Sequence, residues 1–301
     1  MALFWLLWIG LSGVALAQGA LELEVLQRTN QARTEHGLRP LQWDALAHKA
    51  ALAHAQDMLR RNFFAHQNPD GQGAADRLRA IGVLEVMVGE NLASFDGYPD
   101  AEIPRRALVG WMNSPGHRAN LLKPEFTHLG VGLLREGRRV MVVQNFLGRP
   151  FDPQLRQTPA QAERTVLVLS GTAPGTVGVF VGNHLYARLN PPIHTRLELP
   201  PRSEVSYALF DGQTWWATRN GERGLRLETA LEQTQVPGRQ ISFSLPAGSY
   251  TLALGAQPRF WQNISGPVRL ELTLPGTLEA LWLGIRQGNS VNYSHRIPLK
   301  P

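Results

Sequence analysis

The hydrophobic and polar positions change their period part-way along the chain. Up to about residue 122, apolar residues recur three and four positions apart, the spacing of amphipathic helices. From about residue 128 on, short runs of β-branched and aromatic residues are separated by Gly, Pro, Asn and Asp, which is typical of strands and tight turns. The pattern therefore predicts a mainly helical first part that ends in a hairpin, followed by an all-β second part.

Helices precede a hairpin in the first part. Asp44 is a suitable N-cap for the second of these helices, and His48 and His54 are expected on its polar or half-buried face. Gly89-Glu90-Asn91 falls in a loop between the third and fourth helices. This order favours an α+β domain or a layered α-β-α domain. The expected helices are 21–36, 45–62, 75–81 and 100–113, and the expected strands are 128–136 and 138–146.

Residues 150–162 are polar, contain proline and lack a period, so they are predicted to be a linker. Residues 163–301 then read as an all-β, sandwich-like domain. Its aromatic residues either belong to the core and edges, which we favour, or form a platform for sugar. Trp215 and Trp216 must point to opposite faces of a strand, so one of them is expected to be exposed. The other aromatic candidates are Tyr207, Trp261, Trp282 and Tyr293.

Composition narrows the chemistry. With 301 residues, 43% hydrophobic and 18% charged, the chain can bury about two cores. It has no cysteine, which excludes disulfides, cysteine metal ligands and thiol catalysis. The formal charge of +6 is spread along the chain, and no Lys/Arg run exceeds two residues. A nucleic-acid partner is therefore not expected.

The first residues are apolar and lead into Ala15-Leu16-Ala17, which fits the A-x-A cleavage pattern. We therefore predict a signal peptide over 1–17 and a secreted, periplasmic or cell-envelope protein. The segment before the apolar run carries no Lys or Arg, unlike a typical signal peptide. The alternative is that the segment stays uncleaved, in which case it would be a short membrane anchor.

Three side chains in the first part stand out as candidate site residues. His66, Glu90 and His117 each fall between predicted elements, and His117 directly follows the break Ser114-Pro115-Gly116. Two imidazoles and a carboxylate suffice to hold Zn²⁺ with an open position, or to act as an acid–base pair. Their spacing is long-range and no H-E-x-x-H occurs, so a metal role, an acid–base role and a purely structural role stay open.

A series of short motifs, in order along the whole first part, makes residues 21–149 resemble a bacterial member of the CAP superfamily (cysteine-rich secretory, antigen 5 and pathogenesis-related 1 proteins). This resemblance implies a three-layer α-β-α sandwich with a cleft. The motifs are Asn30–Arg33, Leu38–Leu41, Trp43-Asp44, Asn62–His66, Pro69–Gly71, Gly89–Asn91, Trp111–Asn120 and Gly130–Gly132.

In many members of that family the cleft holds two histidines and two glutamates that can bind a divalent metal. The resemblance assigns His66, Glu90 and His117 to three of these positions, while Ser114 occupies the position of the second glutamate. One carboxylate instead of two weakens the case for a tightly held ion such as Zn²⁺, and Glu102 is an alternative that the spacing does not require. Asn91 and Ser114 are then expected to orient the histidines by hydrogen bonds.

The remaining motif residues have structural interpretations. Asn30 and Arg33 are expected to tie the first helix to a neighbouring loop. Trp43, Phe63, Phe64 and Trp111 are expected in the core.

Three functions are compatible with these residues. The first is a secreted binding protein that takes an envelope lipid, glycan or protein ligand in the cleft. The second is a metal-assisted hydrolase in which His66 and His117 hold the ion and Glu90 is a ligand or general base. The third is a structural envelope component with an unused cleft. The sequence has no G-x-S-x-G motif and supports no specific enzymatic activity.

Overall fold

The computed structural model describes residues 5–300 and the side chains of residues 19–300. The chain divides into two compact units, Met1–Pro150 and Phe151–Pro301. The predicted signal peptide over 1–17 falls outside the described side chains, and its cleavage stays a prediction. Among the helices that are described, none is long and apolar enough to cross a membrane.

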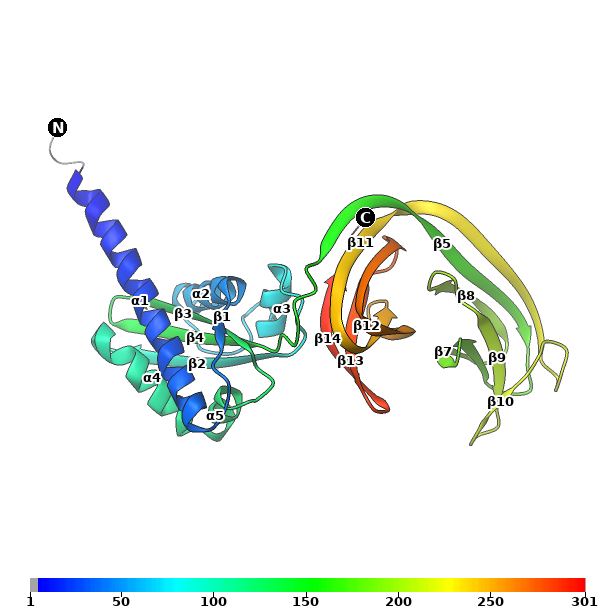
Figure 1. Cartoon of the computed structure of the whole chain (residues 1–301), viewed down its shortest axis with the longest axis horizontal. Helices are drawn as coiled ribbons and strands as arrows, with labels where there is room; N and C mark the ends of the chain where they lie inside the picture. Colours follow the sequence, from blue (N-terminus) through cyan, green and yellow to red (C-terminus); the bar gives the residue numbers. More distant parts are fainter. Residues whose placement is uncertain (1–4, 301) are drawn as a thin grey trace. The chain divides into compact units, whose positions relative to one another are not determined.

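The first unit contains helices, one 3-10 turn and four strands, coloured from blue to green in Figure 1. Its helical elements are α1 (Trp5–Glu35), α2 (Ala45–Arg60), α3 (Ala74–Ala80), η1 (Asp100–Glu102), α4 (Ile103–Met112) and α5 (Pro115–Leu121). Its strands are β1 (Gln42–Trp43), β2 (Val88–Asp96), β3 (His128–Glu136) and β4 (Arg139–Leu147).

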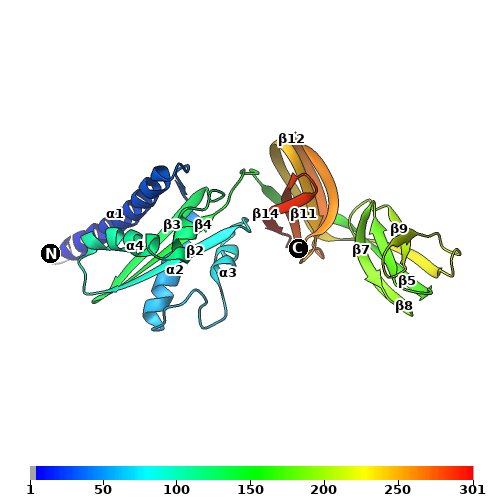
Figure 2. The ribbon, with the colours of Figure 1, turned by 90° about the horizontal axis from the view of Figure 1, so that it is seen from below.

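The four strands form one sheet in the order β1-β3-β4-β2, with β1 parallel to β3 and the other pairs antiparallel. Along β4, alternate residues serve two cores: Val140 and Val142 pack with α1 and α4, while Met141 and Val143 pack with α2. Figure 2 shows α1 and α4 on one side of this sheet and α2 on the other. The predicted α-β-α arrangement of three layers is confirmed.

Glycines and alanines let α2 lie very close to the sheet. A Cβ on Gly130 would lie 1.9 Å from the backbone nitrogen of His48, and one on Gly132 would lie 2.2 Å from that of Leu52. Since those atoms belong to the helix backbone, no side chain could be moved to make room. The fully buried Ala51 and Ala55 complete the contact from the helix side. The Gly-Val-Gly motif is therefore required by packing.

Polar side chains fix the C-terminal end of the first helix and the start of the second, as predicted. Arg33 is fully buried, and its Nη1 donates to the carbonyls of Leu121 (2.8 Å) and Lys123 (3.0 Å). Asn30 exchanges two hydrogen bonds with the backbone of Leu41. At the start of α2, the Asp44 carboxylate accepts from the backbone nitrogen of the third helical residue at 2.7 Å, which confirms the predicted N-cap.

Several predictions for this unit are wrong, among them the polar or half-buried face expected for His54, which is fully buried. Glu90 and Asn91 lie in strand β2 and not in a loop, because two buried polar side chains interrupt the apolar alternation by which a strand is recognised. His117 lies inside the short helix α5 and not on a chain break, since Pro115 occupies its first turn, where proline is tolerated. Phe64 is 51% exposed and does not belong to the core.

The second unit is built of strands, and its all-β class is confirmed. They are β5 (Arg156–Thr172), β6 (Val177–Val181), β7 (His184–Leu189), β8 (Ile193–Leu199), β9 (Val205–Phe210), β10 (Trp215–Ala217), β11 (Arg226–Leu254), β12 (Arg259–Pro275), β13 (Ala280–Gln287) and β14 (Ser290–Pro298). One sheet has the order β10-β9-β6-β7; the other has the order β14-β13-β11-β5-β8, with β12 also paired to β11. Buried residues of both sheets, such as Leu169, Val179 and Leu209, share one core.

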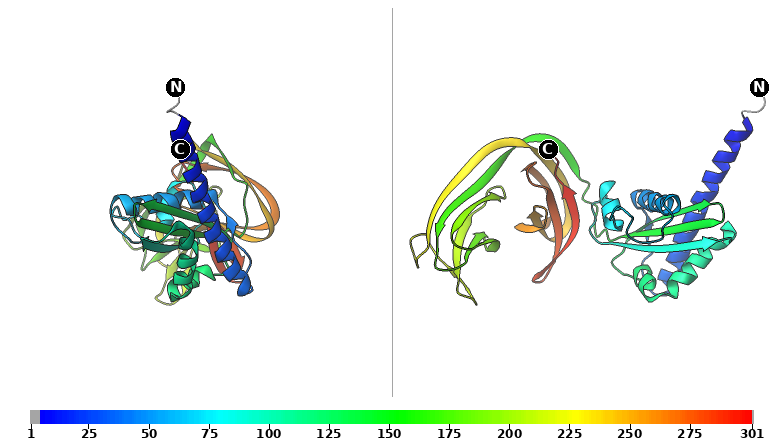
Figure 3. Two further views of the ribbon diagram at one scale, coloured as in Figure 1. Left: turned by 90° about the vertical axis from the view of Figure 1, so that its left-hand side faces the viewer. Right: turned by 180° about the vertical axis from the view of Figure 1, so that it is seen from behind.

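Long strands replace two expected features of this unit. β5 starts at Arg156, so residues 156–162 are paired with β11 and do not belong to a linker. The separate runs 239–245 and 250–255 lie almost wholly in the continuous strand β11, which also includes 226–238. The view from behind in Figure 3 shows β5 and β11 running side by side. Backbone pairing between β5 and β11 extends both strands through residues of low β-propensity.

Candidate functional site

Glu90 is the centre of the site in the first unit. Its side chain is only 4% exposed, and both carboxylate oxygens are engaged. His66 Nδ1 donates to Oε1 at 2.9 Å, and Arg77 Nη2 donates to Oε2 at 2.6 Å. A carboxylate buried in this way needs charged partners, because an unpaired charge is costly away from water.

Arg77 is a site residue that the sequence analysis missed. It projects from α3, and besides Glu90 it binds the chain that carries His66, since Nη1 donates to the carbonyls of His66 (3.0 Å) and Gln72 (2.7 Å). One guanidinium thus fixes both the carboxylate and the loop. No local pattern marks this residue, because its partners lie on a different strand and a different loop.

Asn91, next to Glu90, joins the site to the rest of the unit. Its Nδ2 donates to the main-chain carbonyl of His117 and to the side-chain oxygen of Gln144, both at 3.2 Å. Asn120 Nδ2 donates to Asn91 Oδ1 at 3.0 Å, and Gln144 Nε2 donates to Thr29 in α1 at 2.9 Å. Asn91 therefore positions the backbone of His117, whereas a bond to its imidazole had been expected.

Ser114 stands at the N-cap position of α5, but its hydroxyl makes no capping hydrogen bond. Its carbonyl accepts from the backbone nitrogen of Arg118 at 2.8 Å. The role expected for the Ser114 side chain in orienting a histidine is not visible in the described contacts. Ser114 instead marks the point where the chain turns into α5.

The pKa values of the two histidines of the site are shifted in opposite directions. The hydrogen bond to Glu90 raises the pKa of His66, whose side chain is 61% exposed. Burial lowers the pKa of His117, and the nearby charge of His66 lowers it further. At a given pH the accessible imidazole of His66 therefore carries more positive charge than that of His117.

Comparison with known protein families shows which family the residues around this site resemble. The model of the family described as "CAP: Cysteine-rich secretory protein family" matches residues 26–146. Residues 26–146 are a CAP domain. We refer to His66, Arg77, Glu90 and His117 as the CAP site.

Curated relatives of the CAP domain come from Bacillus subtilis (strain 168). "Uncharacterized protein YkwD" is 38% identical over 130 residues, which cover 43% of this chain and 48% of that protein. "Uncharacterized membrane protein YlbC" is 38% identical over 128 residues, which cover 42% of this chain and 34% of that protein. The chain thus spans about half of YkwD and about a third of YlbC.

Two solved structures are similar to less than half of the chain. An extracellular protein containing a SCP domain from Bacillus anthracis str. Ames is 34% identical, with a TM-score of 0.39, and the match covers 44% of this chain and 41% of that one. A cysteine-rich secretory protein from Staphylococcus aureus subsp. aureus Mu50 is 20% identical, with a TM-score of 0.35, and covers 44% and 40%.

The donor set of the CAP site does not fit a metal ion in this arrangement. Among residues 19–300, no three His, Asp or Glu side chains are grouped so that they could hold one. One oxygen of Glu90 accepts a hydrogen bond from His66 and the other accepts one from Arg77. The permanent positive charge of Arg77 beside the carboxylate disfavours a metal cation there. The alternative carboxylate, Glu102, is paired with Arg106 at 2.7 Å.

The aromatic residues of the second unit do not form one platform. Trp215 packs on Phe180 and Phe210, whereas its neighbour Trp216 is 46% exposed, as predicted for adjacent residues of a strand. Trp282 packs edge-on against Tyr293; these two residues lie in neighbouring strands of one sheet, and Trp215 belongs to the other sheet.

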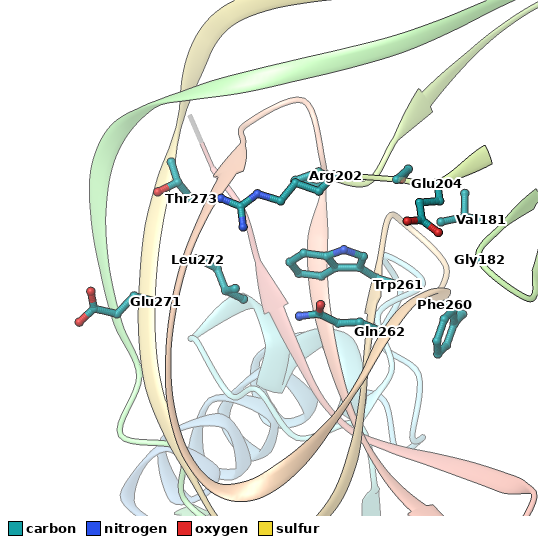
Figure 4. Close-up of a pocket in the computed structure, with 12 residues that line it drawn as sticks. Val181, Gly182, Arg202, Glu204, Phe260, Trp261, Gln262, Glu271, Leu272 and Thr273 are labelled. Atoms are coloured by element: carbon teal, nitrogen blue, oxygen red, sulfur yellow. The ribbon is translucent and has the colours of Figure 1, made fainter.

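Trp261 lies apart from these, at a β-bulge where the β11–β12 register shifts. It lines a cavity of about 520 Å³ together with Arg202 and Gln262. Figure 4 shows the indole and the guanidinium on this cavity. The aromatic residues are thus spread over several parts of the second unit.

Proposed function

We propose that the CAP domain is the binding module of a secreted bacterial protein, and that the CAP site recognises a glycan of the cell envelope. The proposal is supported above all by the chain of contacts Arg77–Glu90–His66. Both oxygens of Glu90 accept a hydrogen bond from a cationic side chain, and the carboxylate is almost fully buried, which argues against a role as general base or metal ligand. It serves instead to hold the exposed imidazole of His66 in place and to favour its protonated form.

The chemistry around His66 favours a sugar-containing ligand over an apolar lipid. The Nε2–H group of a protonated His66 can donate to a hydroxyl or carboxylate oxygen, and the neutral imidazole of His117 supplies an acceptor. Phe64, two residues before His66, is exposed and offers an aromatic face. Hydrogen-bonding groups and an exposed aromatic residue in the same loop suit the polar edges and apolar faces of sugar rings.

Secretion is part of the same proposal. The apolar N-terminal segment with Ala15-Leu16-Ala17 supports export and cleavage after Ala17. Without cleavage, the segment would tether the same domain to a membrane, and the glycan would still be within its reach.

The proposal can be tested by co-sedimentation of the full chain with isolated bacterial sacculi from which phosphate-containing polymers have been stripped. We expect the wild-type protein to pellet with the sacculi. His66→Gln should weaken the affinity for sacculi about tenfold, the effect of losing one charge-assisted hydrogen bond, and His117→Gln should weaken it by a smaller factor, because a neutral acceptor is lost. His36→Gln, at an exposed histidine of the same domain, is the matched control and should bind like wild type.

Two results would overturn this function. Equal binding of wild type and both site variants would show that the CAP site does not make the contact. Release of soluble sugar fragments by the wild type, lost in His117→Ala, would show hydrolysis in place of simple binding. A metal-assisted hydrolase would further require that this activity disappear when divalent metal is removed.

A further inference from the structure

The cavity beside Trp261 lies wholly in the second unit, between the turn that joins β8 to β9 and strand β12. Its volume of about 520 Å³ is within the usual range of small-molecule sites. Arg202 and Glu204 line it from the turn, and Trp261 and Gln262 line it from β12 (Figure 4). The CAP family match ends at residue 146, so it does not include this cavity.

A β-bulge brings two consecutive residues of β12 to the cavity. In the pairing with β11, Leu252 faces Gln262 and Ala253 faces Phe260, so Trp261 is an extra residue without a partner on the other strand. Neighbouring residues of a regular strand point to opposite faces, whereas Trp261 and Gln262 both line this cavity. Bulges often redirect a side chain in this way beside a functional site.

The indole N–H of Trp261 is available to a ligand. Among residues 19–300 it has no hydrogen-bond acceptor, whereas Nε1 of Trp111, Trp216 and Trp282 each donates to an oxygen of the protein. Trp261 is half-buried, and its Nε1 is not one of the fully buried polar atoms that lack a partner. The N–H group is therefore reachable from the cavity.

Arg202 has a backbone conformation that does not explain why an arginine stands there. Its φ of 58° is left-handed, a region that favours glycine. Arg223 has a similar φ of 48°, but its guanidinium lies 5.2 Å from the centre of the Trp216 ring. Arg202 is exposed and has no hydrogen bond, ion pair or ring contact in the described part of the chain. Contact with a ligand in the cavity would account for its side chain.

The polar groups of the cavity favour an uncharged ligand. Arg202 can only donate, the carboxylate of Glu204 accepts, and the amide of Gln262 can do either. The second acid of the lining, Glu271, lies 3.4 Å from Arg269. An anion would be repelled by Glu204, and a cation would be repelled by Arg202. Hydroxyl groups carry no charge and both donate and accept, so they suit all three groups.

We propose that this cavity binds an uncharged sugar ring of a glycan, with the indole of Trp261 against the ring and with Arg202 and Glu204 hydrogen-bonded to its hydroxyl groups. A sugar ring combines an apolar face with a rim of hydroxyls, which matches an aromatic side chain surrounded by donors and acceptors. The site shares no residue with the CAP site, and the proposal does not depend on the function proposed for that site.

The test is calorimetric titration of the full chain with three neutral β-1,4-linked hexasaccharides, of glucose, mannose and N-acetylglucosamine. We expect binding of at least one of them with one hexasaccharide per chain. Trp261→Ala should weaken it about tenfold, and Trp261→Phe, which keeps a ring but loses the N–H group, should weaken it by a smaller factor. Trp216→Ala removes an exposed tryptophan of the same unit and should bind like wild type.

Arg202→Gly separates a role in ligand binding from a structural role. Because glycine tolerates the left-handed conformation, thermal unfolding should show a variant at least as stable as wild type. Sugar binding should nevertheless weaken about tenfold, since a charge-assisted hydrogen bond is lost. Arg223→Gly changes a similar conformation outside the cavity and should leave sugar binding unchanged.

Three results would overturn the proposal: binding of none of the hexasaccharides, equal affinity of Trp261→Ala and Trp216→Ala, or equal loss in the two glycine variants. Hexasaccharide binding that is lost in His66→Gln and kept in Trp261→Ala would also overturn it, because the sugar would then occupy the CAP site. Hexasaccharide binding that depends on Trp261, together with sacculus binding that does not depend on His66, would reject only the function proposed for the CAP site.

Discussion

The ion pair between Arg77 and Glu90 should be a major source of stability for the CAP domain. Replacing Arg77 by leucine leaves the Glu90 carboxylate, 4% exposed, without its permanent cation. Removing one partner of a buried ion pair costs about 3–5 kcal/mol. The carbonyls of His66 and Gln72 also lose a donor, but both residues are exposed, so water can replace it.

The cost should depend on pH through His66. The pKa of His66 is raised in the folded state, so its imidazolium supports Glu90 below the unfolded value of about 6.5, and this support is lost as pH rises through the folded pKa. We therefore expect Arg77→Leu to cost about 3 kcal/mol near pH 6 and up to about 5 kcal/mol near pH 8. Arg77→Lys should fall between wild type and Arg77→Leu, since it keeps the charge but loses the fork of donors.

Urea unfolding followed by circular dichroism at 222 nm measures this quantity in the full chain, because the helices of the described residues all lie in the first unit. A double-mutant cycle with Glu90→Gln isolates the pair. The double variant should be less unstable than the sum of the single ones by about 1–3 kcal/mol. Additive effects, or a cost of Arg77→Leu below about 1 kcal/mol, would refute the assignment of Glu90 as a buried charge held by Arg77.

Three further predictions concern the same unit. In an NMR titration, His66 should titrate above and His117 below the ordinary histidine pKa, and His66→Gln should raise the pKa of His117 by removing a neighbouring positive charge; the reverse order would contradict the geometry. Calorimetry with zinc should show no one-to-one binding tighter than about 10 µM, since the site lacks a free carboxylate; micromolar binding lost in His66→Ala would be the contrary result. Gly132→Ala should destabilise by about 3 kcal/mol or more, because the added Cβ meets the Leu52 backbone nitrogen at 2.2 Å, whereas Gly110→Ala on open helix surface should be neutral or stabilising. Urea unfolding that shows no difference between the two glycine variants would argue against the close helix–sheet packing.

Features that depend on neighbours in sequence could be predicted well. The Asp44 N-cap and the C-terminal ends of the first two helices follow from local hydrogen bonding and spacing, whereas the first helix begins at Trp5 and not at the expected residue 21. The tie between Asn30 and the Leu41 backbone was expected from the family resemblance and is present. That resemblance also brought together His66 and Glu90, whose spacing of 24 residues carries no signal by itself.

Features that depend on distant partners could not be predicted. Arg77 looks like an ordinary surface arginine of a short helix until the fold brings β2 beside it. The strand that contains Glu90 and Asn91 could not be recognised, because these two polar residues interrupt its apolar pattern. They are buried with partners that are distant in the sequence. In the second unit, Pro246 separates two apolar runs and suggests a turn, yet it falls at an irregularity between Leu245 and Gly248 inside one strand.

That irregularity sets where this protein can gain or lose residues. β11 pairs with β5 before this irregularity and with β13 after it, so a single strand joins β5 to β13 within one sheet. An extra residue near Ile241 would reverse the inward and outward positions of the paired residues that follow. An extra residue beside Pro246 would only enlarge a bulge that already exists. Length variation in relatives of this unit should therefore concentrate at this point, where a change of chain length leaves the strand pairs on either side of the bulge in register.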